Sequence, residues 1–183
     1  MTVRRVALIY DNTARPETTG VYCHRALESL LEVEHFLPNQ LNDIPTGKFD
    51  LFLNIDDGIR YSLPEHLKPA AAWIIDTHVD FAWSLEKASQ FEFVFAAQRD
   101  GAEKLKAAGV LNTLWLPLAC DPVVHRSHAV EKEFDVCFVG NQFPGPREDL
   151  LKAIQGTFPN VYIGQRYFED MAYYDINHYE WMT

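Results

Sequence analysis

Residues 70–78 read AAAWIIDTH, an apolar run that ends abruptly in an acid, a hydroxyl and an imidazole. An unbroken apolar run cannot place alternate side chains in water, so it predicts a strand buried on both faces, in the centre of a parallel sheet. Ligands collect outside the carboxyl ends of such strands, so Asp76, Thr77 and His78 stand where binding or chemistry is expected. The alternative, in which Asp76 caps the next helix and His78 is a partly solvated loop residue, stays open.

The composition is that of a globular protein. The 183 residues are 48% hydrophobic and 23% charged, and no apolar run approaches the ~20 residues that a membrane span needs. The opening MTVRRVALIYDN has too short an apolar run for a signal peptide and lacks a small-residue cleavage site, so it predicts a first strand. We therefore expect a cytoplasmic protein.

Charge and cysteine content exclude several classes. The chain has 16 Lys plus Arg against 26 Asp plus Glu, which argues against a general nucleic-acid binder because phosphate attraction drives such binding. A local basic site for one phosphorylated ligand stays open. Cys23, Cys120 and Cys137 are widely spaced and odd in number, which argues against a disulfide framework and a zinc site. We expect them to be small core residues.

Strand and helix patterns alternate along the chain. Strands are expected at 3–10, 34–38, 49–55, 91–97 and 112–118, and helices at 21–33, 63–67, 80–90 and 101–109. This alternation predicts an α/β protein with a doubly wound, Rossmann-like parallel sheet of about six strands. Pro117 suggests either the end of the last strand or an edge position for it. The first strand, loop and helix open a βαβ unit whose helix N–H groups can meet an anion, but they contain no GxGxxG fingerprint.

The pattern restarts after a polar stretch at 123–133, which is typical of a linker. A new buried strand is expected at 134–139, a helix at 147–158 and a strand at 160–164. We therefore predict a Rossmann-like domain at 1–122, a linker at 123–133, and an incomplete second βαβ unit at 134–183.

With these pieces in order, the chain resembles the CgeB-like (spore-maturation-protein-like) glycosyltransferases of the GT-B architecture. The order and spacing of four stretches carry the resemblance: LPEHLKPAAAWIIDTH at 63–78, FEFVFAAQRDGAEKLKAAG at 91–109, WLPLACDPVVH at 115–125 and FDVCFVGNQFPGPREDLL at 134–151. They lie in the part of the chain from about position 49 onward.

The resemblance implies two Rossmann-like domains, the first receiving an acceptor glycan or protein and the second holding a nucleotide sugar. It implies that Gly140 and Asn141 open a glycine loop that approaches the diphosphate. Arg147 would offer a fork of donors to its oxygens, although a solvated residue in the first turn of a helix is an equal alternative. On the acceptor side it implies four loop residues: Asn12, Gly20, Asp56 and Gln98.

Transfer displaces a nucleoside diphosphate from an anomeric carbon, so the protein must activate an acceptor hydroxyl. Asp76 or His78 is the expected base, and a histidine titrates near neutral pH without a large shift. By resemblance the nucleotide sugar is a substrate, and neither a metal nor a cofactor is expected. Neither His125 with His128 nor the Asp56–Asp57 pair is therefore interpreted as a ligand set.

Several alternatives remain open. Such families bind most of the nucleotide sugar with later parts of the second domain, and this sequence stops about fifty residues after Phe134, so a fragment and a natural truncated form are both considered. A non-catalytic Rossmann-like module that binds a sugar, a nucleotide or a protein is the alternative function. The aromatic segment 165–183 would pack on another chain, as in a homo-oligomer, or fold back over the first domain. A hydrolase is disfavoured because no GxSxG elbow is present.

Overall fold

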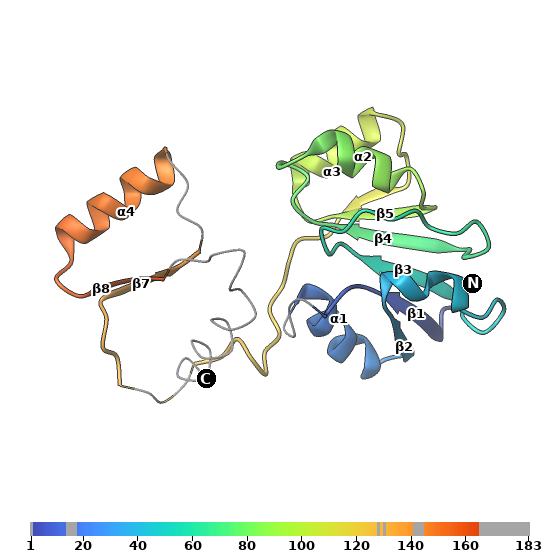
Figure 1. Ribbon diagram of the computed structural model, residues 1–183, viewed down its shortest axis with the longest axis horizontal. Coiled ribbons are helices and arrows are strands. Elements are labelled where there is room, and N and C mark those ends of the chain that lie inside the picture. Colours follow the sequence, from blue (N-terminus) through green and yellow to red (C-terminus); the bar gives the residue numbers. More distant parts are fainter. Residues whose placement is uncertain (1, 14–17, 128, 130, 141–144, 165–183) are drawn as a thin grey trace. The chain divides into compact units, whose positions relative to one another are not determined.

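The computed structural model describes residues 2–13, 18–127, 129, 131–140 and 145–164. The chain divides into two compact units, Met1–Asp121 and Pro122–Thr183. Each unit combines parallel strands with helices (Figure 1). No helix among the described residues is long and apolar enough to cross a membrane.

The first unit is built on a six-stranded parallel sheet in the order β2-β1-β3-β4-β5-β6. Its strands are β1 (Arg5–Ile9), β2 (Glu32–Phe36), β3 (Leu51–Ile55), β4 (Ala70–Ile74), β5 (Phe93–Ala96) and β6 (Thr113–Trp115). Its helices are α1 (Thr19–Glu28), the 3-10 helix η1 (Pro38–Asp43), α2 (Phe81–Ala88) and α3 (Arg99–Ala107). The predicted Rossmann-like α/β fold is confirmed.

Strand β4 is the central buried strand that its sequence predicts. All five of its residues are buried, and it pairs with β3 on one side and β5 on the other. Strand β6 lies at the edge of the sheet and ends before Pro117, as the proline predicts. The loop after the carboxyl end of β4 therefore starts in the middle of the sheet edge.

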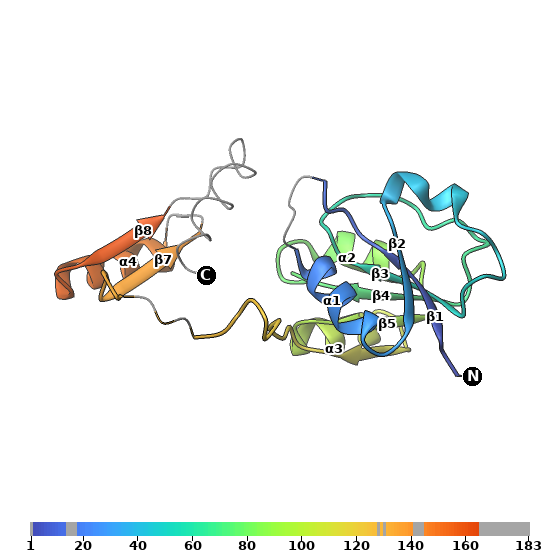
Figure 2. The same cartoon turned by 90° about the horizontal axis from the view of Figure 1, so that it is seen from below.

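Helices cover both faces of this sheet, α1 on one and α2 with α3 on the other (Figures 1 and 2). Alternate residues of each strand point to opposite faces of the sheet and pack in two separate cores. Ala7, Ile9 and Phe52 join the core that includes Ala88 and Leu105 from α2 and α3. A second core lies on the α1 face and consists of Leu8, Tyr10, Ile55 and Trp73, with Val21, Cys23 and Leu27 packed against it.

Helix α1 is shorter than the predicted 21–33. It begins after Thr18, whose Oγ1 accepts a hydrogen bond from the Val21 amide at 3.4 Å, and it ends at Glu28. The amides of Leu30 and Leu31 both donate to the carbonyl of Leu27 and turn the chain into β2. The predicted helix runs too far because Glu32 and Val33 belong to β2 and pair with β1.

Two further predictions were wrong. Residues 63–67 form a turn and not a helix, since the Leu63 amide is held by Gln90 Oε1 at 2.8 Å and the Leu67 amide by the carbonyl of Pro64. Among the cysteines, which are all free thiols, Cys120 and Cys137 are exposed and only Cys23 is partly buried. Cys120 lies in the stretch that follows β6, and Cys137 lies in the strand Val136–Val139, whose residues alternate between half-buried and exposed.

The second unit contains β7 (Val136–Val139), α4 (Pro146–Thr157) and β8 (Val161–Gly164), with β7 and β8 parallel. This is the predicted second βαβ unit. Strand β7 was expected to be buried, but its residues alternate between half-buried and exposed, with Val139 45% exposed. The reason is local, because α4 is the single helix of the described part of this unit. The aromatic segment 165–183 lies outside the described residues.

Candidate functional site

Polar residues follow three neighbouring strands of the first unit at the same edge of the sheet. Asp56 and Asp57 come directly after β3, Asp76 to His78 follow β4, and Gln98 follows β5. The strands are parallel, so their carboxyl ends share one edge, which is the usual place of a ligand in such sheets. This edge is the candidate site.

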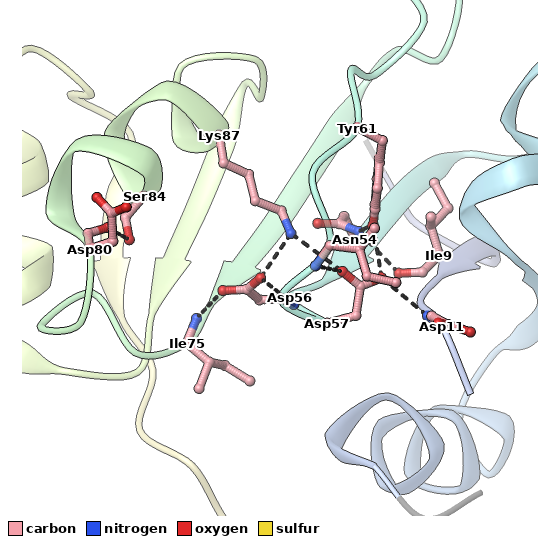
Figure 3. A network of polar contacts seen from close by, with 12 residues as sticks. Ile9, Asp11, Asn54, Asp56, Asp57, Tyr61, Ile75, Asp80, Ser84 and Lys87 are labelled. Carbon is pink, nitrogen blue, oxygen red and sulfur yellow. Dashed lines mark hydrogen bonds and ion pairs between the residues drawn. The ribbon is translucent and has the colours of Figure 1, made fainter. Parts of the chain in front are cut away.

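A buried ion-pair network lies at the end of β3 (Figure 3). The Lys87 Nζ atom, reaching across from α2, is 2.9 Å from Asp56 Oδ1 and 3.8 Å from Asp57 Oδ1. The three side chains are only 4–5% exposed. One ammonium thus faces two carboxylates in a place almost closed to water, where unpaired charges are costly.

The two carboxylates also tie strand ends together. Asp56 Oδ2 accepts a hydrogen bond from the Ile75 amide, just after β4, at 3.0 Å. Asp57 Oδ2 accepts from the Asp11 amide, just after β1, at 3.1 Å, and from the Tyr61 hydroxyl at 3.2 Å. The network therefore fixes the ends of β1, β3 and β4 relative to one another.

Burial sets the proton affinities in this network. It raises the pKa of Asp57, and the attraction of Lys87 and the hydrogen bonds to Asp57 oppose that rise. Burial, followed by the neighbouring charge of Asp57, raises the pKa of Tyr61, so its hydroxyl stays a neutral donor. The side chain of Asn54 donates to the Ile9 carbonyl at 3.2 Å and to the Tyr61 hydroxyl, while its buried Oδ1 has no hydrogen-bond partner among the residues that the structure describes.

Asp56 is thus part of a network that is closed by the chain's own lysine. A cation bound between Asp56 and Asp57 would have to displace the Lys87 ammonium. Within the described ranges, no group of three or more potential metal ligands is found. The network at the end of β3 therefore holds the neighbouring loops in place and does not offer a cation site.

The loop after β4 is open. Asp76 and His78 are exposed, while Thr77 between them is 3% exposed. Asp76 has a φ of 60°, in the left-handed region that costs an L-residue roughly 1–2 kcal/mol. Its carbonyl accepts a hydrogen bond from the Val79 amide at 2.9 Å, which closes the turn. The turn presents a carboxylate and an imidazole to solvent from the middle of the sheet.

Thr77 anchors this loop to α3. Its amide and Oγ1 both donate to Gln98 Oε1, at 3.3 and 3.2 Å. A Cβ atom on Gly101 would lie 2.0 Å from Thr77 Oγ1, so the helix can approach only because residue 101 is glycine. Gln98, expected on the acceptor side, holds the loop that carries Asp76 and His78.

Two other acceptor-side residues follow β1. Asn12 is half-buried in the loop after the strand, and Gly20 is buried in the first turn of α1. A Cβ atom on Gly20 would lie 2.3 Å from Tyr10 Cγ, so this glycine lets α1 pack directly on the tyrosine ring. The Tyr10 hydroxyl lies 3.2 Å from His24 Nδ1, and its ring stacks on His35 with 3.9 Å between centroids.

The residues expected to meet a nucleotide sugar belong to the second unit. The Gly140 amide donates to the Gly164 carbonyl at 3.2 Å, at the end of β7. Arg147 is exposed in the first turn of α4, after Gly145 with a φ of 105°. Asn141 and His128 lie outside the described residues, and His125 is exposed.

Sequence reasoning missed Lys87 and Tyr61. Lys87 lies in the expected helix 80–90, four residues after Trp83, and so on the same helix face as an aromatic residue. That spacing, together with the unexplained Asp56–Asp57 pair, is the signal that could have indicated a buried lysine. A comparison of the sequence with protein-family models and with curated proteins finds no match.

Proposed function

We propose that the protein is a GT-B-type glycosyltransferase that moves a sugar from a nucleotide-sugar donor to an acceptor hydroxyl. The observation that carries the proposal is the anchored loop after β4, which presents Asp76 and His78 to solvent at the carboxyl edge of the central strand. The first unit, by resemblance the acceptor side, is followed in the chain by a second parallel βαβ unit with a glycine at the end of its first strand.

The proposed chemistry needs few groups. Asp76 or His78 accepts the proton of the acceptor hydroxyl, and the oxygen attacks the anomeric carbon of the donor. The bond from that carbon to the diphosphate oxygen breaks, and the nucleoside diphosphate leaves with the electron pair. Arg147 at the start of α4 opposes the negative charge that develops on the diphosphate.

The test is a calorimetric titration of the chain with a panel of nucleoside diphosphates and their sugars, with release of nucleoside diphosphate assayed in the same samples. We expect saturable binding of one nucleotide and slow turnover. Arg147→Ala should weaken binding at least tenfold, whereas Lys152→Ala, on the same helix, should leave it unchanged. The absence of binding by every nucleotide and nucleotide sugar contradicts the proposal for this chain.

A non-catalytic Rossmann-like binding module is the second candidate. It is favoured by the strained loop at Asp76, which is as suited to holding a ligand as to chemistry. Binding of a nucleotide sugar without any turnover, in the presence of sugar acceptors, would select the module. If His78→Ala and Asp76→Asn each abolish turnover and leave binding intact, the enzyme is selected.

A further inference from the structure

A small pocket in the first unit is used by none of the chemistry above. It lies between the loop 59–62 that follows β3 and the helix α2, with Trp83, Glu86, Lys87 and Gln90 on the helix side. Its volume is about 200 Å³. At ~30 Å³ for each liquid water, that is the space of roughly seven waters. It is below the ~300 Å³ at which sites for larger ligands begin.

The two cations in the lining of this pocket already have partners. Lys87 Nζ is paired with Asp56 and lies 5.3 and 5.4 Å from the ring centroids of Tyr61 and Trp83. The Arg60 guanidinium lies 3.6 Å from Asp80 and 5.7 Å from the Trp83 ring centroid. A phosphate or carboxylate ligand would have to compete with these carboxylates, so the pocket does not favour an anion.

Several neutral or acidic hydrogen-bonding groups remain unused at the same place. In the part of the chain that the structure describes, the protein offers no hydrogen-bond or ion-pair partner to the exposed Ser62 hydroxyl and Glu86 carboxylate, or to the Trp83 indole N–H and the Gln90 amide nitrogen. The Gln90 oxygen is fixed by the Leu63 amide at 2.8 Å, which orients its nitrogen. The pocket thus offers donors and acceptors together beside two aromatic rings, Tyr61 and Trp83.

We infer that this pocket binds one six-membered ring of a carbohydrate. A sugar ring is neutral, fits the volume, and carries hydroxyls that both donate and accept. The inference deepens the proposed function, on which it rests for its meaning, by naming a glycan as the acceptor. Arg60 is paired with Asp80, two residues after His78, so the pocket adjoins the loop that carries the proposed base.

The test is a ¹H–¹⁵N NMR titration of the whole chain with methyl glycosides of glucose, galactose, mannose and N-acetylglucosamine. The sequence has four tryptophans, so the indole signals can be assigned by substitution. We expect the Trp83 indole signal to shift saturably with at least one glycoside. Trp83→Phe and Glu86→Gln should each weaken that binding at least fivefold.

Matched controls separate the pocket from general surface effects. Trp115 also lies under an arginine, with Arg99 5.5 Å from its ring centroid, and Glu103 is an exposed glutamate on a helix. Trp115→Phe and Glu103→Gln should leave the affinity unchanged. The inference is overturned if no glycoside shifts the Trp83 signal, or if the control variants lose as much affinity as the pocket variants.

The two proposals fail in different ways. Glycoside binding at Trp83 in a chain that binds no nucleotide sugar would sustain the inference and contradict the transferase. Nucleotide-sugar turnover that is unchanged in Trp83→Phe, together with silent Trp83 signals, would sustain the transferase and overturn the inference.

Discussion

The ends of β3 and β4 lie side by side at one edge of the sheet, yet they carry their acidic residues in opposite ways. Asp56 and Asp57, after β3, are buried and share the Lys87 ammonium. Asp76, after β4, is exposed, and its backbone is held in the left-handed region by the turn. Both strands are followed by acidic residues. After β3 these residues form a buried structural joint, the Asp56–Asp57–Lys87 network, whereas after β4 the acid faces solvent.

The difference lies in what the neighbouring elements supply. The last turn of α2 brings a lysine to the end of β3, whereas Gln98, the residue before α3, and Gly101 of α3 contact the end of β4. The lysine pairs with both carboxylates and closes the site. Gln98 accepts hydrogen bonds from Thr77, and the Asp76 carboxylate and the His78 imidazole stay exposed to solvent. The side chain that packs against each strand end therefore decides whether its acidic residue is buried in an ion pair or exposed to a ligand.

The largest expected effect is loss of the buried ammonium. Lys87→Met should lower the free energy of unfolding by about 3–5 kcal/mol, because it leaves two buried carboxylates without their cation. Urea unfolding followed by circular dichroism measures it. Lys104→Met, which removes an exposed i,i+4 pair with Asp100, should cost no more than about 0.5 kcal/mol. Equal losses for the two variants would show that Lys87 does not hold the joint.

The second effect concerns the packing of α3 against Thr77 in the loop after β4. Gly101→Ala places a methyl group 2.0 Å from Thr77 Oγ1, and we expect a loss of about 1–3 kcal/mol in unfolding free energy. Gly156→Ala, in α4 with nothing within 4 Å of the new carbon, should instead raise stability by about 0.5–1 kcal/mol. If Gly101→Ala is neutral, α3 does not pack on Thr77 as described.

A smaller effect tests the strained turn. Asp76→Gly should be more stable than Asp76→Ala by about 1 kcal/mol, since glycine adopts a φ of 60° freely and alanine does not. The measurement is thermal or urea unfolding of the two variants. His78→Ala, at an exposed position, should stay within about 0.5 kcal/mol of the parent. Equal stability of Asp76→Gly and Asp76→Ala would argue against the left-handed conformation.

The smallest effect is the pH dependence of the buried joint. Burial raises the pKa of Asp57 above its ordinary value of 3.8, so in the window just above 3.8 the folded state binds more protons than the unfolded state. The stability of the parent relative to Asp57→Asn should therefore fall as pH rises through that window. Urea unfolding at a series of pH values between 3 and 7 measures this difference.

Glu92 supplies the opposite sign as a control. Burial works to raise its pKa, but hydrogen bonds from Lys68 and the Ala70 amide outweigh burial and hold the pKa below its ordinary value of 4.5. The stability of the parent relative to Glu92→Gln should therefore be complete above 4.5 and fall as pH drops below it. Slopes of the same sign for Asp57 and Glu92 would contradict the account.

The sequence was informative where one periodicity dominates. The apolar run 70–74 could bury both faces only in the middle of a sheet, and β4 lies there. It was uninformative where a contact between distant segments decides. The burial of Lys87 depends on a loop 31 residues earlier in the chain, and the end of α1 depends on the pairing of β2 with β1. The periodicity of either segment alone does not specify such contacts.

The candidate site follows the same division. The parallel topology placed Asp56, Asp76 and Gln98 at one edge, as the strand order predicts. The residues next to Asp56 and Asp76 in the sequence do not predict which of the two carboxylates is buried, because both acids follow buried strands. The pocket at Trp83, proposed above to bind a sugar ring, is not indicated by the sequence, because Trp83 and residues 59–62 come from separate segments.

The central claim is tested most directly by comparing Asp56→Asn with Asp76→Asn in urea unfolding. We expect Asp56→Asn to lower the free energy of unfolding by about 2–4 kcal/mol, because it breaks a buried pair with Lys87. Asp76→Asn should change it by no more than about 0.5 kcal/mol, since asparagine tolerates the left-handed backbone and the carboxylate is exposed. Comparable losses for the two variants would contradict the division between a closed and an open strand end.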